Sequence, residues 1–160
     1  MGEWHNKMTY PEINVRLRTD TDFNSMTDEE HHLKQTLSPL ASLVKMVTMF
    51  PLDYMHLCCL GVTRKLLYIW MRGKSLATRL SSKSIEEISV KLKGLGPYTP
   101  SEFSRKPRHL SEIDRWKATE LRYFMLYAGP VVLKNTIALE IYENFMLLSV
   151  AMHLLLSPGT

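Results

Sequence analysis

The chain has 160 residues, which is enough for one domain with a buried core. Its composition, 45% hydrophobic and 22% charged, excludes disordered, collagen-like and mucin-like chains. The two cysteines are adjacent, so they form neither a disulfide framework nor a Cys-x-x-Cys metal site, and we expect a reducing, intracellular compartment. No apolar run in the first 25 residues resembles a signal peptide, and the apolar stretch 145–156 is shorter than the roughly 20 residues of a membrane span, so we expect no membrane partner.

The net charge of +4 is unevenly distributed. Residues 1–35 carry four basic and seven acidic groups, whereas residues 64–93 carry eight basic and two acidic groups. A basic middle permits contact with nucleic acid, although solvated helix faces give the same pattern.

Apolar and polar residues alternate between Glu12 and Thr19, which is the period of a half-buried strand. No second stretch alternates as well, so this strand is expected to pair outside the chain or to lie as an extended arm on the helices. The following pattern is helical. A capping-box spacing from Thr27 predicts a short helix through Leu33, and residues 37–49 are expected to form a second helix.

Pro51 suits the first turn of a third helix. Three-and-four spacing predicts one inward stripe on it, made of Leu52, Met55, His56, Cys59, Thr63, Leu66, Leu67 and Trp70, with Arg64, Lys65 and Arg72 toward solvent. His56 is therefore expected near the buried face, with Asp53 one turn before it. This pair has the geometry to share a hydrogen bond or a metal ion, but a purely structural role is the more common explanation for such a pair.

Ser84 is expected to cap the next helix, with Ile85, Ile88 and Leu92 inward. Residues 94–107 are rich in Gly and Pro and predict a long connection, which runs into a basic cluster at 105–109. A helix capped at 111–114 should then run to Ala128 and stop at Gly129-Pro130. The last helix, 138–156, is apolar nearly all round and is expected to be central in the core.

Glu120 lies in the middle of an aromatic stripe on the helix from Ser111, among Ile113, Trp116, Phe124 and Tyr127. A buried carboxylate needs a proton, a cationic partner or a metal ion. A local salt bridge to Lys117 or Arg122, or a marginal position on the helix, accounts for it equally. The adjacent His31 and His32 are expected to point to different faces and therefore not to chelate a metal ion together. Cys58 and Cys59 are expected to pack as small apolar groups. No nucleophile motif or phosphate-binding glycine loop is visible, so a small-molecule substrate is not expected.

Several blocks, in order along the chain, resemble transposase-like proteins of CACTA (EnSpm-type) DNA transposons. The longest is FPLDYMHLCCLGV at 50–62. The others are YPEINVRLRTD at 10–20, EEHHL at 29–33, PSEFSRKPR at 100–108, DRWKATELR at 114–122 and GPVVLK at 129–134.

The resemblance implies an RNase-H-like nuclease in which three acidic residues hold two Mg²⁺ or Mn²⁺ ions for DNA strand transfer. Asp53 and His56 match the Asp-x-x-His signature of such enzymes, and Glu120 is the candidate third acid, with Asp114 as an alternative. The strands that carry the first two acids are expected before residue 1. One acid of three cannot hold two metal ions, so we expect no cofactor and no stand-alone catalysis for this chain.

The resulting expectation is a mainly α fragment: the helical insertion and C-terminal helices of the nuclease domain, with at most one or two short strands near the N-terminus. It is treated as a single partial domain, 1–160, with an arm at 1–26, the insertion at 27–93, a basic linker at 94–110 and C-terminal helices at 111–160. The expected partner is DNA in the nucleus, contacted through Arg64, Lys65, Arg105, Lys106 and Arg108. The alternative is a non-catalytic DNA-binding or protein-interaction module, with self-association possible through exposed apolar surface.

Overall fold

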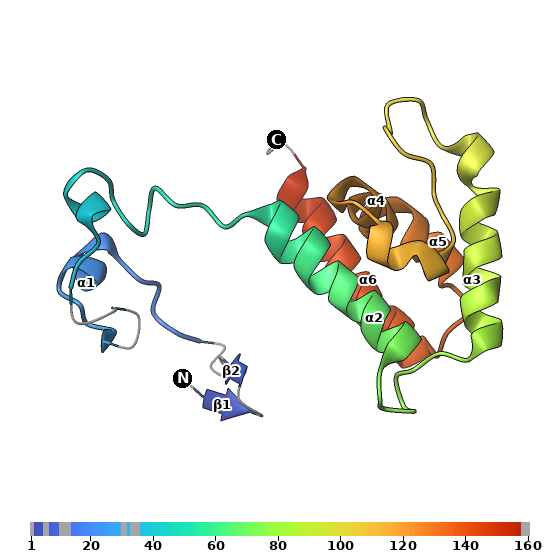
Figure 1. Ribbon diagram of the computed structural model, residues 1–160, viewed down its shortest axis with the longest axis horizontal. Coiled ribbons are helices and arrows are strands. Elements are labelled where there is room, and N and C mark those ends of the chain that lie inside the picture. The colour runs from blue at the N-terminus through green and yellow to red at the C-terminus, as the bar shows by residue number, and fades with distance from the viewer. Residues whose placement is uncertain (1, 5–6, 10–13, 30–31, 33–35, 158–160) are drawn as a thin grey trace. The chain divides into compact units, whose positions relative to one another are not determined.

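The computed structural model describes residues 2–4, 7–9, 14–29, 32 and 36–157, and the fold is mainly helical, as expected (Figure 1). The chain divides into two compact units, Met1–Leu52 and Asp53–Thr160. The boundary falls inside the segment 27–93 that was expected as one insertion.

The N-terminal unit holds little regular structure. Strands β1 (Gly2–Trp4) and β2 (Lys7–Thr9) pair antiparallel. Helix α1 (Asp20–Asn24) begins with a capping box, in which Thr19 Oγ1 accepts from the backbone N–H of Asp22 and the Asp22 carboxylate accepts from the Thr19 N–H. The 3₁₀ helix η3 (Pro39–Ser42) follows.

One prediction for this unit is wrong, and one stays a prediction. Residues 14–19 pair with no described strand, and Val15 and Leu17 are exposed, so pairing of this segment outside the chain is not tested. Residues 37–49 form the short η3 and turns rather than an α-helix, because most of these side chains remain exposed and little burial supports a helix. The helix expected from Thr27 lies only partly within the described residues, where Asp28 is not helical and Glu29 is in a 3₁₀ turn.

The C-terminal unit begins with a long helix that changes its winding. Its first part, η4 (Met55–Thr63), is π-helical and continues directly into α2 (Arg64–Arg72). The next helix, α3 (Ser82–Gly94), is capped by Ser81 rather than Ser84, whose backbone N–H donates to Ser81 Oγ at 3.1 Å. Ile88 and Leu92 are buried on it, as predicted.

After α3 come a short 3₁₀ helix, η5 (Gly96–Tyr98), and the expected long connection. The single helix expected from Ser111 to Ala128 is instead broken. A 3₁₀ helix, η6 (Leu110–Arg115), ends at Trp116, and both Trp116 and Lys117 have extended backbone.

Helix α4 (Ala118–Tyr123) then runs through the π-helical η7 (Phe124–Ala128) into α5 (Gly129–Val132). Gly129-Pro130 therefore does not stop the helix. The wide turn in front of Pro130 is closed by the Gly129 N–H, which donates to Phe124 O, so the donor that proline lacks falls in the first turn of α5.

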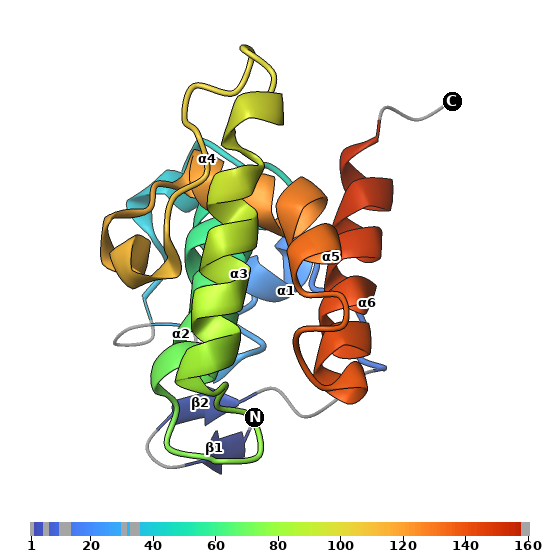
Figure 2. The same cartoon turned by 90° about the vertical axis from the view of Figure 1, so that its right-hand side faces the viewer.

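Aromatic rings connect the helices of this unit. Phe145 of the last helix, α6 (Leu139–Leu156), meets Trp70 of α2 and Phe124 of η7 with ring centroids 5.9 and 5.8 Å apart. Phe124 in turn lies 6.0 Å from Trp116. Helix α3 lies on the side of the core seen at the front of Figure 2, where Ile88 and Leu92 are fully buried.

Helix α6 is not central in the core. Its buried residues are Phe145, Ser149 and Met152, whereas Leu147, Leu154 and Leu155 are 72%, 72% and 76% exposed. The other helices pack against one face only, so the opposite apolar face stays uncovered. Within the described part of the chain, α6 is the helix whose length and composition would allow it to cross a membrane.

Candidate nucleic-acid interface

Glu120 is buried at the start of α4, as the sequence predicted. It is 6% exposed, and its Oε2 accepts a hydrogen bond of 2.8 Å from the backbone N–H of Lys117, which caps the helix. Ile113, Trp116 and Phe124 are buried around it as expected, but Tyr127 is 42% exposed. The π-helical winding of η7 moves Tyr127 off the inward face.

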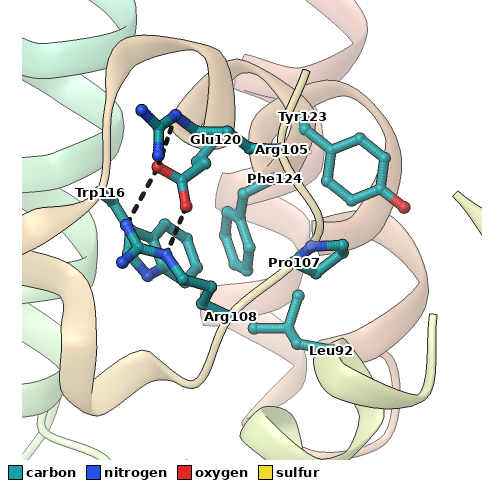
Figure 3. A pocket seen from close by; sticks show the side chains of 8 residues that line it. All are labelled: Leu92, Arg105, Pro107, Arg108, Trp116, Glu120, Tyr123 and Phe124. Carbon is teal, nitrogen blue, oxygen red and sulfur yellow. Dashed lines mark hydrogen bonds and ion pairs between the residues drawn. The ribbon is translucent and has the colours of Figure 1, made fainter. Parts of the chain in front are cut away.

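A cationic partner compensates the buried Glu120 carboxylate. Arg108 Nε donates to Glu120 Oε1 at 2.6 Å, and Arg108 Nη2 donates to Oε2 at 3.1 Å. The same guanidinium donates to Glu112 at 3.2 Å, and Arg105 Nε lies 4.0 Å from Oε2. Figure 3 shows the carboxylate between the two arginines, beside the ring of Trp116. The Glu120 carboxylate raises the pKa of Arg108.

The partner of Glu120 is therefore not one of the two that the sequence suggested. Lys117 contributes its backbone N–H, and the charge comes from Arg108, twelve residues before Glu120. The basic cluster at 105–109 is in part a structural element that ties the long connection to α4.

The surroundings of Glu120 do not fit a divalent metal ion. Both carboxylate oxygens already accept hydrogen bonds, and the nearest charged groups are cations. Among the described residues, no group of three His, Cys, Asp or Glu side chains is placed to hold a metal. Asp114, the alternative acid, is exposed and bonded to Arg72. Glu120 as a metal ligand stays a prediction for a protein that also carries the missing acids.

Asp53 and His56 do lie together, but at the surface. Asp53 Oδ1 accepts from the His56 backbone N–H at 3.1 Å, and Asp53 Oδ2 lies 2.5 Å from His56 Nδ1. These bonds lower the pKa of Asp53. The His56 side chain is 66% exposed, so the expectation that it lies near the buried face is wrong.

The π-helical winding of η4 explains the position of His56. A helix with i→i+5 bonds turns less per residue than an α-helix, so the three-and-four stripe does not stay on one face. Met55 is exposed with His56, and burial begins at Cys59. Leu52, which was expected on the same stripe, lies before η4 and is exposed. The later stripe residues Thr63, Leu67 and Trp70 are buried as predicted.

The five predicted DNA contacts differ in how free their charged groups are. Arg108 is held by Glu120, and Arg64 Nη2 donates to Trp116 O at 2.6 Å. Lys106 Nζ donates to Thr99 O at 2.9 Å, although its side chain is exposed. Lys65 is exposed, and the Arg105 side chain is 49% exposed.

The break between η6 and α4 exposes two further cations that the sequence analysis did not select. Arg115 and Lys117, with Arg64, line an open groove of about 550 Å³. Its remaining lining residues are Met55, Leu60, Asp114, Trp116, Ala118 and Thr119. The buried Arg64 Nε and Trp116 Nε1 find no acceptor among the described residues. The sequence signal was the run Asp114-Arg115-Trp116-Lys117, in which charged residues flank a tryptophan and which an unbroken helix would have spread around its surface.

The C-terminal unit is the basic part of the protein. Between residues 53 and 160 the chain carries 15 Lys and Arg against nine Asp and Glu, a net charge of +6. Most of these cations form no ion pair with a described carboxylate, and Arg115 and Lys117 are among them.

No protein-family profile matches the chain, and no curated protein and no solved structure is significantly similar to it.

Proposed function

We propose that this chain is part of a CACTA-like DNA transposase, and that its C-terminal unit binds DNA without cutting it. The resemblance of the blocks at 50–62, 100–108 and 114–122 supports the family. The observation that carries the binding function is the groove between η4 and α4, where Arg64, Arg115 and Lys117 come together. Such a protein would act in the nucleus.

The chemistry of the groove suits a phosphate backbone. Lysine and arginine side chains that neutralise phosphates release condensed counterions, and this release drives binding that weakens as salt rises. The groove presents three cations and one acid, Asp114, whose charge is already balanced by Arg72.

The binding test is a salt titration of affinity for a fluorescein-labelled 20-base-pair duplex, measured by fluorescence anisotropy. Replacing Arg115 and Lys117 together by alanine should lower the slope of log K against log salt by about one to two, since each phosphate contact contributes about 0.9. Lys134→Ala is the control, because Lys134 is exposed and does not line the groove. An unchanged slope in the double variant would reject the groove as the interface.

The same preparation tests the absence of catalysis. Incubation of the wild-type chain with the duplex and Mg²⁺ or Mn²⁺ should leave the DNA uncut, because Glu120 is engaged by Arg108 and no described acidic cluster can hold the ions. Metal-dependent nicking by the chain would contradict the proposal.

The uncovered face of α6 favours self-association as a second function. Met146, Leu147, Val150, Ala151 and Leu154 form an apolar depression with Glu143 as its charged member. Two copies paired antiparallel along α6 would place the acidic end of one helix, with Glu140 and Glu143, beside the His153 end of the other. Exposed apolar patches of this kind mark protein interfaces.

A further inference from the structure

Tyr98, at the end of η5, presents its ring to solvent. The residue is 83% exposed, and no described group forms a hydrogen bond or a ring contact with its side chain. Other tyrosines of this unit are engaged: the Tyr68 hydroxyl donates to Asp114, and the Tyr142 hydroxyl donates to Pro130 O. Tyr123 packs edge-on against Phe103.

The backbone beneath the Tyr98 ring is fixed. The Tyr98 N–H donates to Leu95 O at 3.1 Å. Thr99 is 4% exposed, its hydroxyl donates to Leu95 O at 2.9 Å, and it lies 3.3 Å from the Tyr123 hydroxyl. Phe103 anchors the next part of the loop by its contacts with Tyr123 and Tyr127. The exposed ring therefore stands on backbone that needs little further ordering when a ligand binds.

Two cations belong to the same loop. Lys106 Nζ lies 2.9 Å from the carbonyl of Thr99, the residue that follows Tyr98. Arg105 precedes Lys106; its Nε lies 4.0 Å from Glu120 Oε2, and its side chain is 49% exposed. Figures 1 and 2 both show this loop extending past the C-terminal end of α3, away from the body of the unit.

We propose that Tyr98 is a stacking platform for an unpaired base of single-stranded DNA, with neighbouring phosphates on Lys106 and Arg105. Proteins hold single strands with exposed aromatic rings and with cations that follow the backbone, because every base offers a face for stacking and every nucleotide a phosphate. The Tyr98 loop carries both kinds of side chain. In an intact duplex the base faces are covered by their neighbours, so the ring adds affinity for single strands only. This inference rests on the proposed DNA binding and assigns it a substrate class.

The test compares labelled dT20 with the labelled 20-base-pair duplex, using the full chain at one moderate salt concentration. Tyr98→Ala should weaken dT20 binding about tenfold, within the range measured for loss of a stacked base, and should leave duplex binding unchanged. Tyr98→Trp should restore dT20 binding. Leu76→Ala is the matched control, since Leu76 is 82% exposed and lies in another loop. Circular dichroism melting should be unchanged for Tyr98→Ala, because its ring is 83% exposed and packs against no described residue.

The outcomes separate this inference from the proposed function. Equal dT20 affinity for Tyr98→Ala and the wild type, with duplex binding intact, overturns the stacking platform and leaves the groove proposal standing. An equal loss on dT20 and duplex also overturns it, since stacking on an unpaired base cannot weaken duplex binding. A wild-type chain that binds neither DNA overturns both.

Discussion

Arg108 Nε lies 2.6 Å from Glu120 Oε1, and this contact joins the connection after α3 to the first turn of α4. The guanidinium also donates to Glu112 and to the carbonyl of Arg115, which the break before α4 leaves without a helical partner. One side chain thus neutralises a buried acid and closes the end of η6. The loop that carries Tyr98 and Lys106 is held in place from its far end by this pair.

Glu120→Gln is expected to destabilise the protein by about 2 kcal/mol. Arg108 would keep its partly buried charge without its main partner, and breaking a buried ion pair from one side is costly. Chemical denaturation followed by circular dichroism measures the change. If Glu120 were instead a metal-site acid without its partner acids, Glu120→Gln would stabilise the protein, because it would remove an unpaired buried charge.

Glu102→Gln is the control for that measurement. Glu102 is an exposed carboxylate in the same connection and forms no ion pair with a described residue, so its change should stay within about 0.5 kcal/mol. Equal effects of the two substitutions would contradict a special role for the Arg108–Glu120 pair.

The free energy of unfolding of the C-terminal unit should fall at low pH because Asp114 becomes protonated. Bonds from Arg72 and then Tyr68 lower the pKa of Asp114 from 3.8 to about 2 in the folded protein. A carboxyl group whose pKa is lower in the folded than in the unfolded protein stabilises the folded state. This stabilisation is complete above the unfolded pKa, near 4, and is lost as the pH falls through the folded pKa of about 2. The difference in unfolding midpoint between wild type and Asp114→Asn should therefore be constant from pH 5 to pH 7 and shrink below about pH 4. A difference that does not change with pH would argue against an ionised Asp114 as its source.

Gly129→Ala is expected to destabilise by about 2 kcal/mol through overpacking. A Cβ at this position would collide with the Phe145 ring and with the carbonyl of Phe124, and the carbonyl belongs to the helix and cannot move away. Gly94→Ala is the opposite case, because nothing lies within 4 Å of its Cβ position at the end of α3. That control should be neutral or stabilising by up to about 1 kcal/mol, as alanine is the better helix former. Thermal melting compares the two, and a stable Gly129→Ala protein would mean that α5 and α6 pack less closely than described.

Self-association through α6 should depend on its uncovered leucines. The double substitution of Leu147 and Leu154 by glutamine removes apolar surface that the fold does not use, so the monomer should remain folded. Sedimentation equilibrium should show at least a tenfold weaker dimer than the wild type. Val90→Gln, on the exposed side of α3, should associate like the wild type. If the wild-type chain stays monomeric over a hundredfold range of concentration up to its solubility limit, self-association is rejected as a function.

The sequence pattern located much of the helical core. Periodicity placed Ile88, Leu92 and Phe124 inside, and the charge of Glu120 within an aromatic stripe marked it as a buried group in need of a partner. The start of α1 was not predicted. This helix begins with a Thr-x-x-Asp capping box at Thr19, which directly follows the alternating segment that predicted a strand.

Tertiary structure decided which partner Glu120 has, where the helices change winding and whether an apolar face is covered. Arg108 reaches Glu120 only because the connection folds back onto α4, which no local pattern encodes. The π-helical turns of η4 and η7 moved His56 and Tyr127 to the surface, since a face predicted at 3.6 residues per turn shifts when the turn widens. The sequence of α6 is apolar on nearly all sides. A helix is buried all round only where other elements pack on every side of it, and the described helices pack against one face of α6 alone.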